Sequence, residues 1–141
     1  MNEAGVWSYL KNGMKNTGWL PTRLENSVAK GVPDVHYTIP GAHGFIEFKY
    51  IPEYPKRPTT PLKLPLRAEQ KLWIKTRGEM AGDVWVFVRV EDDFYLLQSF
   101  VALRLCEGWD TIQWKRIPHW HKRVDWLQLR EMLKEGGGGD E

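Results

Sequence analysis

The chain has 141 residues, of which 42% are hydrophobic and 27% are charged. This length and apolar content are typical of one globular domain and exclude a disordered chain. The formal net charge of +2 is too small to identify a partner, so the distribution of the charges matters more. We expect one domain over residues 1–135 and a flexible, Gly-rich acidic tail over residues 136–141.

The sequence shows no run of 18 apolar residues and no charged N-terminal stretch followed by an apolar core. We therefore expect neither a membrane span nor a secretory signal. The single Cys106 cannot form an internal disulfide, which fits a reducing cytosol, and its leucine neighbours favour a buried thiol over a nucleophile. Together with the missing secretory signal, these features predict a cytoplasmic protein. No P-loop or GxGxxG motif occurs, so we expect no nucleotide cofactor.

Two elements are expected before the central motif. Residues 2–16 predict an amphipathic helix, and Glu3 falls in its first turn, where a carboxylate complements the helix dipole. Residues 19–25 predict an edge strand with Arg23 and Glu25 on one face. A surface ion pair is one interpretation of these two residues. The alternative is that Glu25 helps to bind a metal ion, as the second of two such ions in the protein, while Arg23 contacts a phosphate.

Residues 44–50 carry the pattern around which the chain is organised. Bulky apolar side chains alternate there with a functional pair, which is the period-2 signature of a strand. Glu47 and Lys49 fall on one face beside Phe45, about 7 Å apart along the strand, and can share one ligand. The opposite face carries the other bulky side chains, Ile46, Phe48 and Tyr50.

Asp34 stands thirteen residues before Glu47 and directly before a second strand-like run at residues 35–39. Turn residues join the two runs, and a hairpin between them brings Asp34 towards Glu47. Two carboxylates beside Lys49 form a site for a hard divalent cation and a polyanion. Gly31, shortly before Asp34, suits the close approach of another backbone.

Pro33-Asp34 followed by Glu47-Phe48-Lys49 resembles the signature of the PD-(D/E)xK nuclease superfamily. The wider phrases at residues 31–35 and 45–49 look most like its VRR-NUC and Holliday-junction-resolvase-like branch. In that branch a helix with a glutamine follows, and residues 68–73 with Gln70 are similar. The resemblance covers residues 2–97. It implies an α/β restriction-endonuclease-like core, a mixed central sheet flanked by helices in the order helix–strand–strand–strand–helix–strand, with C-terminal additions.

The chemistry follows from the charge that the reaction handles. A phosphodiester is anionic and gains charge at its oxygens as water attacks, so a nuclease built on carboxylates needs a metal. We assign Asp34 and Glu47 to Mg²⁺, with Mn²⁺ as a substitute, and the carbonyl of Phe48 as a further ligand. Lys49 orients or deprotonates the attacking water. Orientation is favoured because the neighbouring carboxylates keep the Lys49 amine protonated, and an ammonium cannot act as a base. The resemblance implies a metal-directed Glu3 and products with 5′-phosphate and 3′-hydroxyl ends.

A proline-rich basic stretch follows the motif. Prolines stand at 52, 55, 58, 61 and 65, the first four at a spacing of three, which predicts an extended segment; a proline-rich ligand for another protein is the alternative. Between residues 49 and 75, seven basic residues accompany two acidic ones, a net charge of +5. Such stretches are commonly solvated surface, but this position suits a nucleic-acid backbone. The residues assigned to DNA here are Lys56, Arg57, Lys63, Arg67 and Gln70.

The remaining pattern predicts six further elements. They are a helix over 66–80, a buried strand over 84–90, a short strand over 94–97, a helix over 99–105, a strand over 111–117 and a helix over 125–135. Asp125 with Gln128 resembles a capping box that opens the last helix.

Residues 111–123 interleave aromatic rings with cations and contain no acidic residue. This pattern suits stacking on exposed bases and phosphate contacts, to which we assign Lys115, Arg116 and Trp120. Core tryptophans on a basic surface strand are the alternative. His119 and His121 are weak indications of a structural zinc, because no paired cysteines accompany them.

We therefore expect a Mg²⁺-dependent, structure-selective endonuclease that hydrolyses phosphodiesters in branched DNA, with a Holliday junction resolvase as one form. The resemblance alone implies a homodimer. The alternatives are a DNA end or flap nuclease, a catalytically silent DNA-binding module on the same fold, and a proline-rich adaptor. Intact Asp34, Glu47 and Lys49 argue against the silent module, because binding alone needs no carboxylates facing phosphate.

Overall fold

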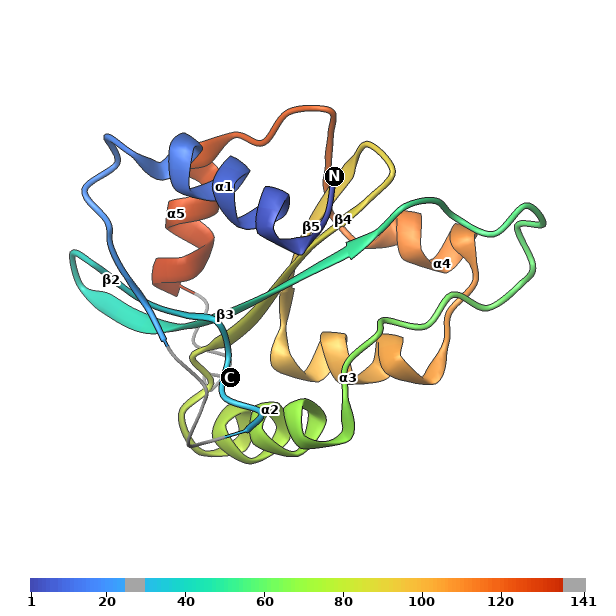
Figure 1. Cartoon of the computed structure of the whole chain (residues 1–141), viewed down its shortest axis with the longest axis horizontal. Coiled ribbons are helices and arrows are strands. Elements are labelled where there is room, and N and C mark those ends of the chain that lie inside the picture. The colour runs from blue at the N-terminus through green and yellow to red at the C-terminus, as the bar shows by residue number, and fades with distance from the viewer. Residues whose placement is uncertain (25–29, 136–141) are drawn as a thin grey trace.

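The computed structural model describes residues 1–24 and 30–135. Over these residues it contains a six-stranded mixed sheet with strand order β1-β2-β3-β4-β5-β6, flanked by helices (Figure 1). The strands are β1 (Leu20–Arg23), β2 (Val35–Ile39), β3 (Ala42–Ile51), β4 (Val84–Val90), β5 (Asp93–Gln98) and β6 (Trp120–His121). The helices are α1 (Glu3–Met14), α2 (Ala68–Ala81), α3 (Ser99–Glu107), α4 (Thr111–Arg116) and α5 (Trp126–Glu135).

The pairing of the strands places β3 inside the sheet. β1, β2 and β3 form an antiparallel meander, β3 runs parallel to β4, and β4, β5 and β6 continue antiparallel. A parallel pair needs a long crossover, which the proline-rich segment and α2 provide. The expected order helix–strand–strand–strand–helix–strand is confirmed.

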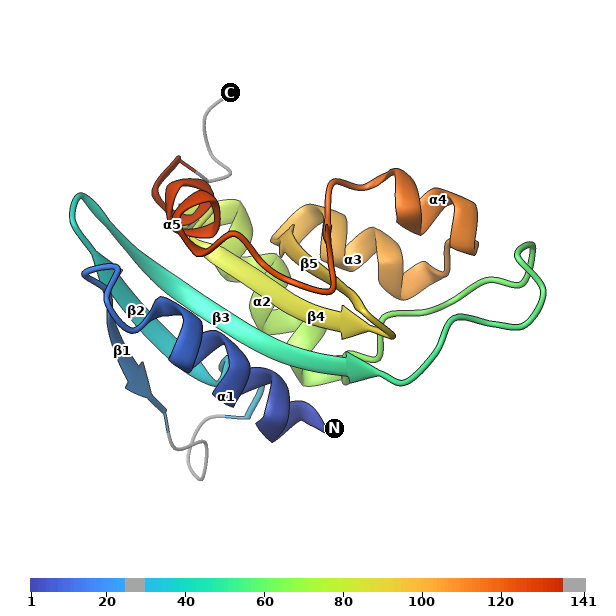
Figure 2. The same ribbon diagram turned by 90° about the horizontal axis from the view of Figure 1, so that it is seen from above.

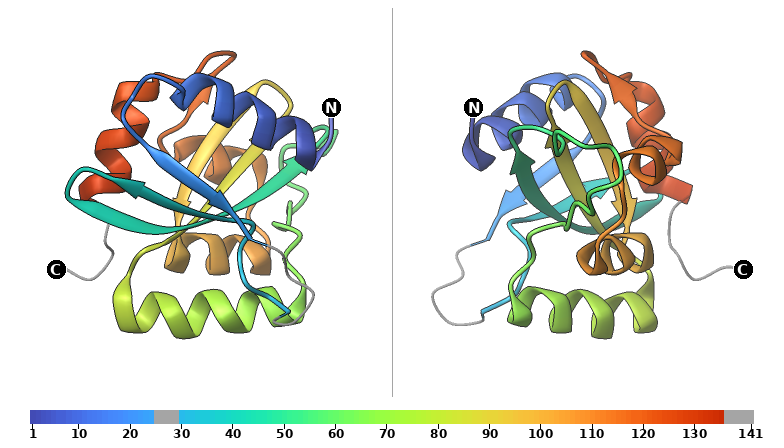
Figure 3. Two further views of the ribbon diagram at one scale, coloured as in Figure 1. Left: turned by 60° about the vertical axis from the view of Figure 1, so that its left-hand side comes forward. Right: turned by 90° about the vertical axis from the view of Figure 1, so that its right-hand side faces the viewer.

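Helices cover both faces of the sheet (Figure 3). α1 and α5 bury apolar side chains such as Leu10 and Leu129 against Ile46 and Phe48 of β3. α2, α3 and α4 cover the opposite face, where Ile51 joins the second core cluster. The period-2 assignment of faces along β3 is therefore confirmed: even-numbered apolar residues face α1 and α5, and Glu47 and Lys49 face the other way.

The segment between β3 and α2 is extended and held to the body of the protein. Its one β-bridge among the described residues joins Leu62 and Trp109, and the N–H of Leu64 also donates to the Leu105 carbonyl at 3.0 Å. Nearer β3, the hydroxyl of Tyr54 donates to Asp93 Oδ2 at 2.6 Å. The segment projects beyond the sheet at the carboxyl end of β3 (Figure 2), so its basic tip is presented to solvent.

The expected strand over residues 111–117 is wrong, because this stretch forms α4. A reciprocal capping box starts the helix: the amide of Gln113 donates to Asp110 Oδ1 at 2.8 Å, and the amide of Asp110 donates to Gln113 Oε1 at 3.0 Å. These bonds satisfy two donors that a helix start leaves unpaired. Trp114 then points into the core and is fully buried.

The other expected helices and strands are present, with ends that shift by a few residues. The expected cap of the last helix is confirmed, since the amide of Gln128 donates to Asp125 Oδ1 at 3.1 Å. Residues 136–141, the expected tail, lie outside the described residues. Within residues 1–24 and 30–135, none of the helices combines the length and apolarity that a membrane crossing requires.

Candidate active site

The β2–β3 hairpin places Asp34 beside Glu47. Val35 pairs with Ile46 across the two strands, so the residue before Val35 meets the residue after Ile46. The backbone N–H of Phe48 donates to Asp34 Oδ2 at 3.1 Å, which fixes the carboxylate against β3. The two acidic residues that the sequence separates by thirteen positions are thus brought together.

Glu47 is buried and held by a glutamine from α2. Its residue surface is 2% exposed, and Gln70 Nε2 donates to its Oε2 at 2.9 Å. Gln70 is itself oriented, because its Oε1 accepts the backbone N–H of Arg67 at 2.9 Å. The contact that the structure gives Gln70 is therefore with a site carboxylate, whereas the sequence assigned it to DNA.

Glycine at position 31 allows the start of α2 to approach the loop before Asp34. Gly31 has φ of +89°, and a Cβ there would collide with the carbonyl oxygen of Glu69. Only glycine adopts this backbone without strain, and it leaves room for the neighbouring backbone. The close approach expected at Gly31 is confirmed, and it brings the helix end that carries Gln70 to the site.

Lys49 lies between two carboxylates. Its Nζ is 3.8 Å from Glu47 Oε2 and 3.8 Å from Glu3 Oε2, and the residue is only 5% exposed. Glu3 begins α1, so the first helix contributes a charge to the site through Lys49. The lysine is thus positioned as a buried ammonium beside the acidic pair, which agrees with an orienting role.

The acidic pair cannot readily carry two negative charges. Burial, followed by the charge of Asp34, raises the pKa of Glu47 from 4.5 to about 8, although Lys49 opposes the rise. With a pKa near 8, the Glu47 carboxyl without metal is mostly protonated at neutral pH. A divalent cation between the two carboxylates would remove this repulsion.

The donor set fits a magnesium ion. Mg²⁺ is commonly held by one or two carboxylates and keeps several waters, which matches Asp34 and Glu47. The described residues contain no group of three or more His, Cys, Asp or Glu side chains around one point, but a dicarboxylate site with waters needs only two. The contacts from Phe48 N–H and Gln70 hold the two carboxylates in place, as is usual around metal ligands.

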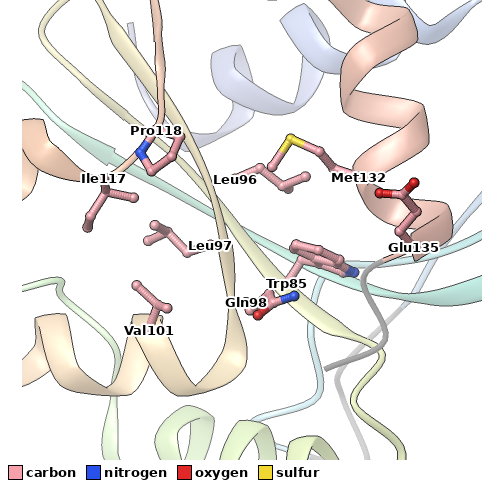
Figure 4. Close-up of a pocket in the computed structure, with 9 residues that line it drawn as sticks. All are labelled: Trp85, Leu96, Leu97, Gln98, Val101, Ile117, Pro118, Met132 and Glu135. Carbon is pink, nitrogen blue, oxygen red and sulfur yellow. The ribbon is translucent and has the colours of Figure 1, made fainter. Parts of the chain in front are cut away.

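Of two hollows in the surface, one is lined by Glu3 and the other by none of the assigned site residues. An open groove of about 550 Å³ is lined by the first residues of the chain, including Glu3, and by Tyr50 and Pro52 at the end of β3; neither Asp34 nor Glu47 lines it. A separate pocket of about 350 Å³ lies between β5, α3 and α5, with Leu96 and Val101 in its wall (Figure 4). That pocket is mainly apolar and gathers none of the assigned site residues.

The basic residues assigned to DNA lie at the surface. Lys56, Arg57 and Lys63 are exposed on the proline-rich segment, and Arg67 is exposed at the start of α2, paired with Glu69 at 3.0 Å. Arg23 is exposed on β1, with its guanidinium 5.6 Å from the ring centroid of Trp7. Glu25 lies outside the described residues, so its pairing with Arg23 and its metal role stay predictions.

The aromatic patch of residues 111–123 divides into two parts. Trp114 is fully buried and its Nε1 donates to the Leu62 carbonyl at 3.0 Å, so the core interpretation is confirmed for this ring. Trp120 is only partly buried, and its Nε1 donates to Gln128 Oε1 at 2.8 Å. Lys115 and Arg116 are exposed on α4, and Lys115 Nζ lies 4.8 Å from the Tyr54 ring centroid.

Sequence reasoning missed the anchor of the proline-rich segment. Asp93 is 4% exposed and accepts hydrogen bonds from Tyr54 at 2.6 Å and from His121 Nδ1 at 2.8 Å. No short motif links these three residues, since they come from separate parts of the chain. Their contacts hold the start of the basic segment against β5 and β6.

No protein-family model matches the chain, and no curated protein matches its sequence. Function is therefore inferred from the site.

Replacing Glu3 with Gln tests how α1 acts on the site. Because Glu3 contacts Lys49, we expect the cleavage rate at saturating Mg²⁺ to fall several-fold while the half-saturating Mg²⁺ concentration stays nearly constant. Outer groups of a metal site typically change metal affinity by about 10–100-fold when they act on the ligands. A shift of that size in the Mg²⁺ titration would instead show that Glu3 acts on the metal ligands or is one of them.

Proposed function

We propose that this protein is a metal-dependent endodeoxyribonuclease of the PD-(D/E)xK type. One observation carries the proposal: the carboxylates of Asp34, directly before β2, and of Glu47, on β3, meet beside the buried ammonium of Lys49. The element order around them supports the same assignment, because the meander, the α2 crossover and the parallel β4 surround this motif. A binding module has no need for a buried acidic pair that repels phosphate.

Asp34 and Glu47 would hold Mg²⁺, with the Phe48 carbonyl as the further ligand assigned from the sequence. When bound, the ion supplies a water of lowered pKa and compensates charge on the phosphate. Lys49 orients the attacking water and stabilises the charge that develops at the phosphate oxygens, since its ammonium is fixed beside Glu47. Gln70 keeps the Glu47 carboxylate in one orientation.

Branched DNA is the proposed substrate, as the resemblance implies, and the exposed basic residues support binding to a DNA backbone. The proline-rich segment, which directly follows the strand that carries Glu47 and Lys49, presents Lys56 and Arg57 at an exposed tip beyond the sheet. Such a segment supplies phosphate contacts to any DNA, and Trp120 is the residue assigned to the unpaired bases of a branched substrate. We further propose a homodimer in which each protomer cuts one strand of a four-way junction.

The direct test is cleavage of four-way, flap, nicked and linear DNA by the purified chain, with Mg²⁺ and with EDTA. We expect Mg²⁺-dependent cleavage, fastest on the four-way junction. Faster cleavage of flaps or ends would support the proposed nuclease activity but would show that its substrate is a flap or an end and not a junction. Binding without cleavage of any of the four would overturn the proposal in favour of a silent module.

Replacing Lys56 and Arg57 together with Ala should weaken binding to duplex and junction alike. Each lost phosphate contact lowers the slope of log affinity against log salt by about one unit, so the double variant should lose about two. A matched double variant, Arg104→Ala with Lys134→Ala, removes the same charge from exposed positions on α3 and α5 and should keep the parental slope. Equal slopes for both double variants would remove the segment from the DNA interface.

Replacing Trp120 with Ala should act differently. Stacking of an aromatic ring on an unpaired base contributes roughly 1–3 kcal/mol, which a perfect duplex does not offer. We expect weaker binding to junction and single-stranded DNA and unchanged binding to duplex, with circular dichroism showing an intact fold. If the variant unfolds, or if junction affinity is unchanged, Trp120 is a core residue and this DNA contact must be dropped.

A further inference from the structure

Two imidazole rings meet across the β2–β3 hairpin, nearer its turn than the acidic pair and separated from it by Phe45. His36 Nε2 and His43 Nδ1 are 3.2 Å apart, and the ring planes are inclined at 55°. The register explains the meeting, because His36 pairs with Phe45 and His43 pairs with Thr38. The two histidines are therefore diagonal neighbours on one face of the hairpin.

The separation of the two nitrogens matches that of two ligands on one ion. Imidazole nitrogens bind zinc at about 2.0–2.1 Å, so two of them on a tetrahedral ion lie about 3.3–3.4 Å apart. The present contact also requires that one nitrogen offers its lone pair, because a hydrogen bond needs an acceptor. At least one ring is thus already in the form that binds metal.

The surroundings leave access to the pair. His43 is exposed, and the neighbouring hollow of about 370 Å³ is lined by His43, Arg77 and Asp83. Arg77 forms two hydrogen bonds with Asp83, at 3.0 and 2.9 Å, so its charge is compensated by that carboxylate. Water can therefore reach the open side of the histidine pair and complete the coordination of an ion.

We propose that His36 and His43 form a second cation site, for a borderline-soft divalent ion such as Zn²⁺. Imidazole suits such ions, whereas Mg²⁺ prefers the carboxylate oxygens of the first site. No third His, Cys, Asp or Glu joins the pair in the described part of the chain, so the ion would have two protein ligands and water. It would link β2 to β3, the strands that hold Asp34 and Glu47 side by side.

Calorimetric titration of Zn²⁺ into the full chain tests this site. The parent for the experiment carries Asp34→Asn, Glu47→Gln and Cys106→Ser, so that neither the acidic pair nor the thiol competes and the result is independent of the proposed nuclease. We expect one Zn²⁺ per chain, and at least tenfold weaker binding after either His36→Ala or His43→Ala, as for loss of one ligand of two. His43 is exposed, so its variant should fold even if His36→Ala does not.

The other two histidines provide the matched control. His119→Ala with His121→Ala removes the same chemistry from another part of the sheet and should leave Zn²⁺ affinity unchanged. Zn²⁺ should also slow amide exchange in β2 and β3 of the parent but not of the His43→Ala protein. Equal affinity for parent and His43→Ala, loss of affinity only in the His119/His121 variant, or no Zn²⁺ uptake would each overturn the proposal.

Discussion

Asp34→Asn and Glu47→Gln should each nearly abolish DNA cleavage. Both changes remove a charge that holds Mg²⁺ while keeping the size of the side chain. We expect single-turnover rates to fall by roughly three orders of magnitude, which corresponds to about 4 kcal/mol of transition-state stabilisation. Binding to DNA in EDTA should persist for both variants and can strengthen for Asp34→Asn, because that change removes a negative charge facing phosphate.

Two exposed acidic residues are matched controls for this experiment. Asp92→Asn and Glu79→Gln make the same chemical changes at side chains that are 55% and 67% exposed and lie in ion pairs with Arg89 and Lys75. Both control proteins should cleave at nearly the parental rate. Parental cleavage by Asp34→Asn or Glu47→Gln would show that the site is wrongly assigned.

The second large effect concerns stability against pH in the absence of metal. Glutamate ionises near pH 4.5 when unfolded, and burial beside Asp34 raises the pKa of Glu47 in the folded protein to about 8. Between these two pH values the folded protein binds one proton more than the unfolded chain. The contribution of Glu47 to the free energy of unfolding is therefore fully present below pH 4.5 and is lost as the pH rises to about 8. The loss should be on the order of 3–5 kcal/mol, since one unit of pKa is worth about 1.4 kcal/mol.

Glu47→Gln removes this proton and should remove the loss with it. Urea unfolding in EDTA should give a free energy that is several kcal/mol higher for the variant than for the parent above pH 8, and similar values at low pH. Mg²⁺ added above pH 8 should stabilise the parent and leave the variant unchanged. Parallel pH profiles for the two proteins would mean that Glu47 is not a strained carboxylate, and Glu79→Gln serves as the neutral comparison.

Local sequence patterns predict much of this fold, because they are clearest in the β2–β3 hairpin that carries the candidate site. The alternation along residues 44–50 assigns both faces of β3, and the turn residues after β2 predict the hairpin that brings Asp34 to Glu47. Asn2 caps α1 through a bond from Gly5 N at 2.9 Å, as its position suggests. These features depend on neighbouring residues, which a sequence displays directly.

The rest depends on contacts between distant residues or on competing local signals. The aromatic and apolar residues of α4 predict a strand when the sequence alone is considered. The Asp110–Gln113 capping box favours a helix, but it is a short signal beside that pattern. The bond from Gln70 to Glu47 and the burial that raises the pKa of Glu47 arise only when α2 packs on the sheet. The Tyr54–Asp93 contact likewise joins segments that no motif relates.

The most direct test of the metal site is an anomalous difference map from crystals of the chain soaked in Mn²⁺ above pH 8, where Glu47 is ionised. The proposed site predicts a peak at coordinating distance, about 2–2.5 Å, from carboxylate oxygens of both Asp34 and Glu47. The same soak of Asp34→Asn crystals should show a much weaker peak. A map with no peak between these two residues, from protein that cleaves DNA with Mn²⁺ in solution, would contradict the site.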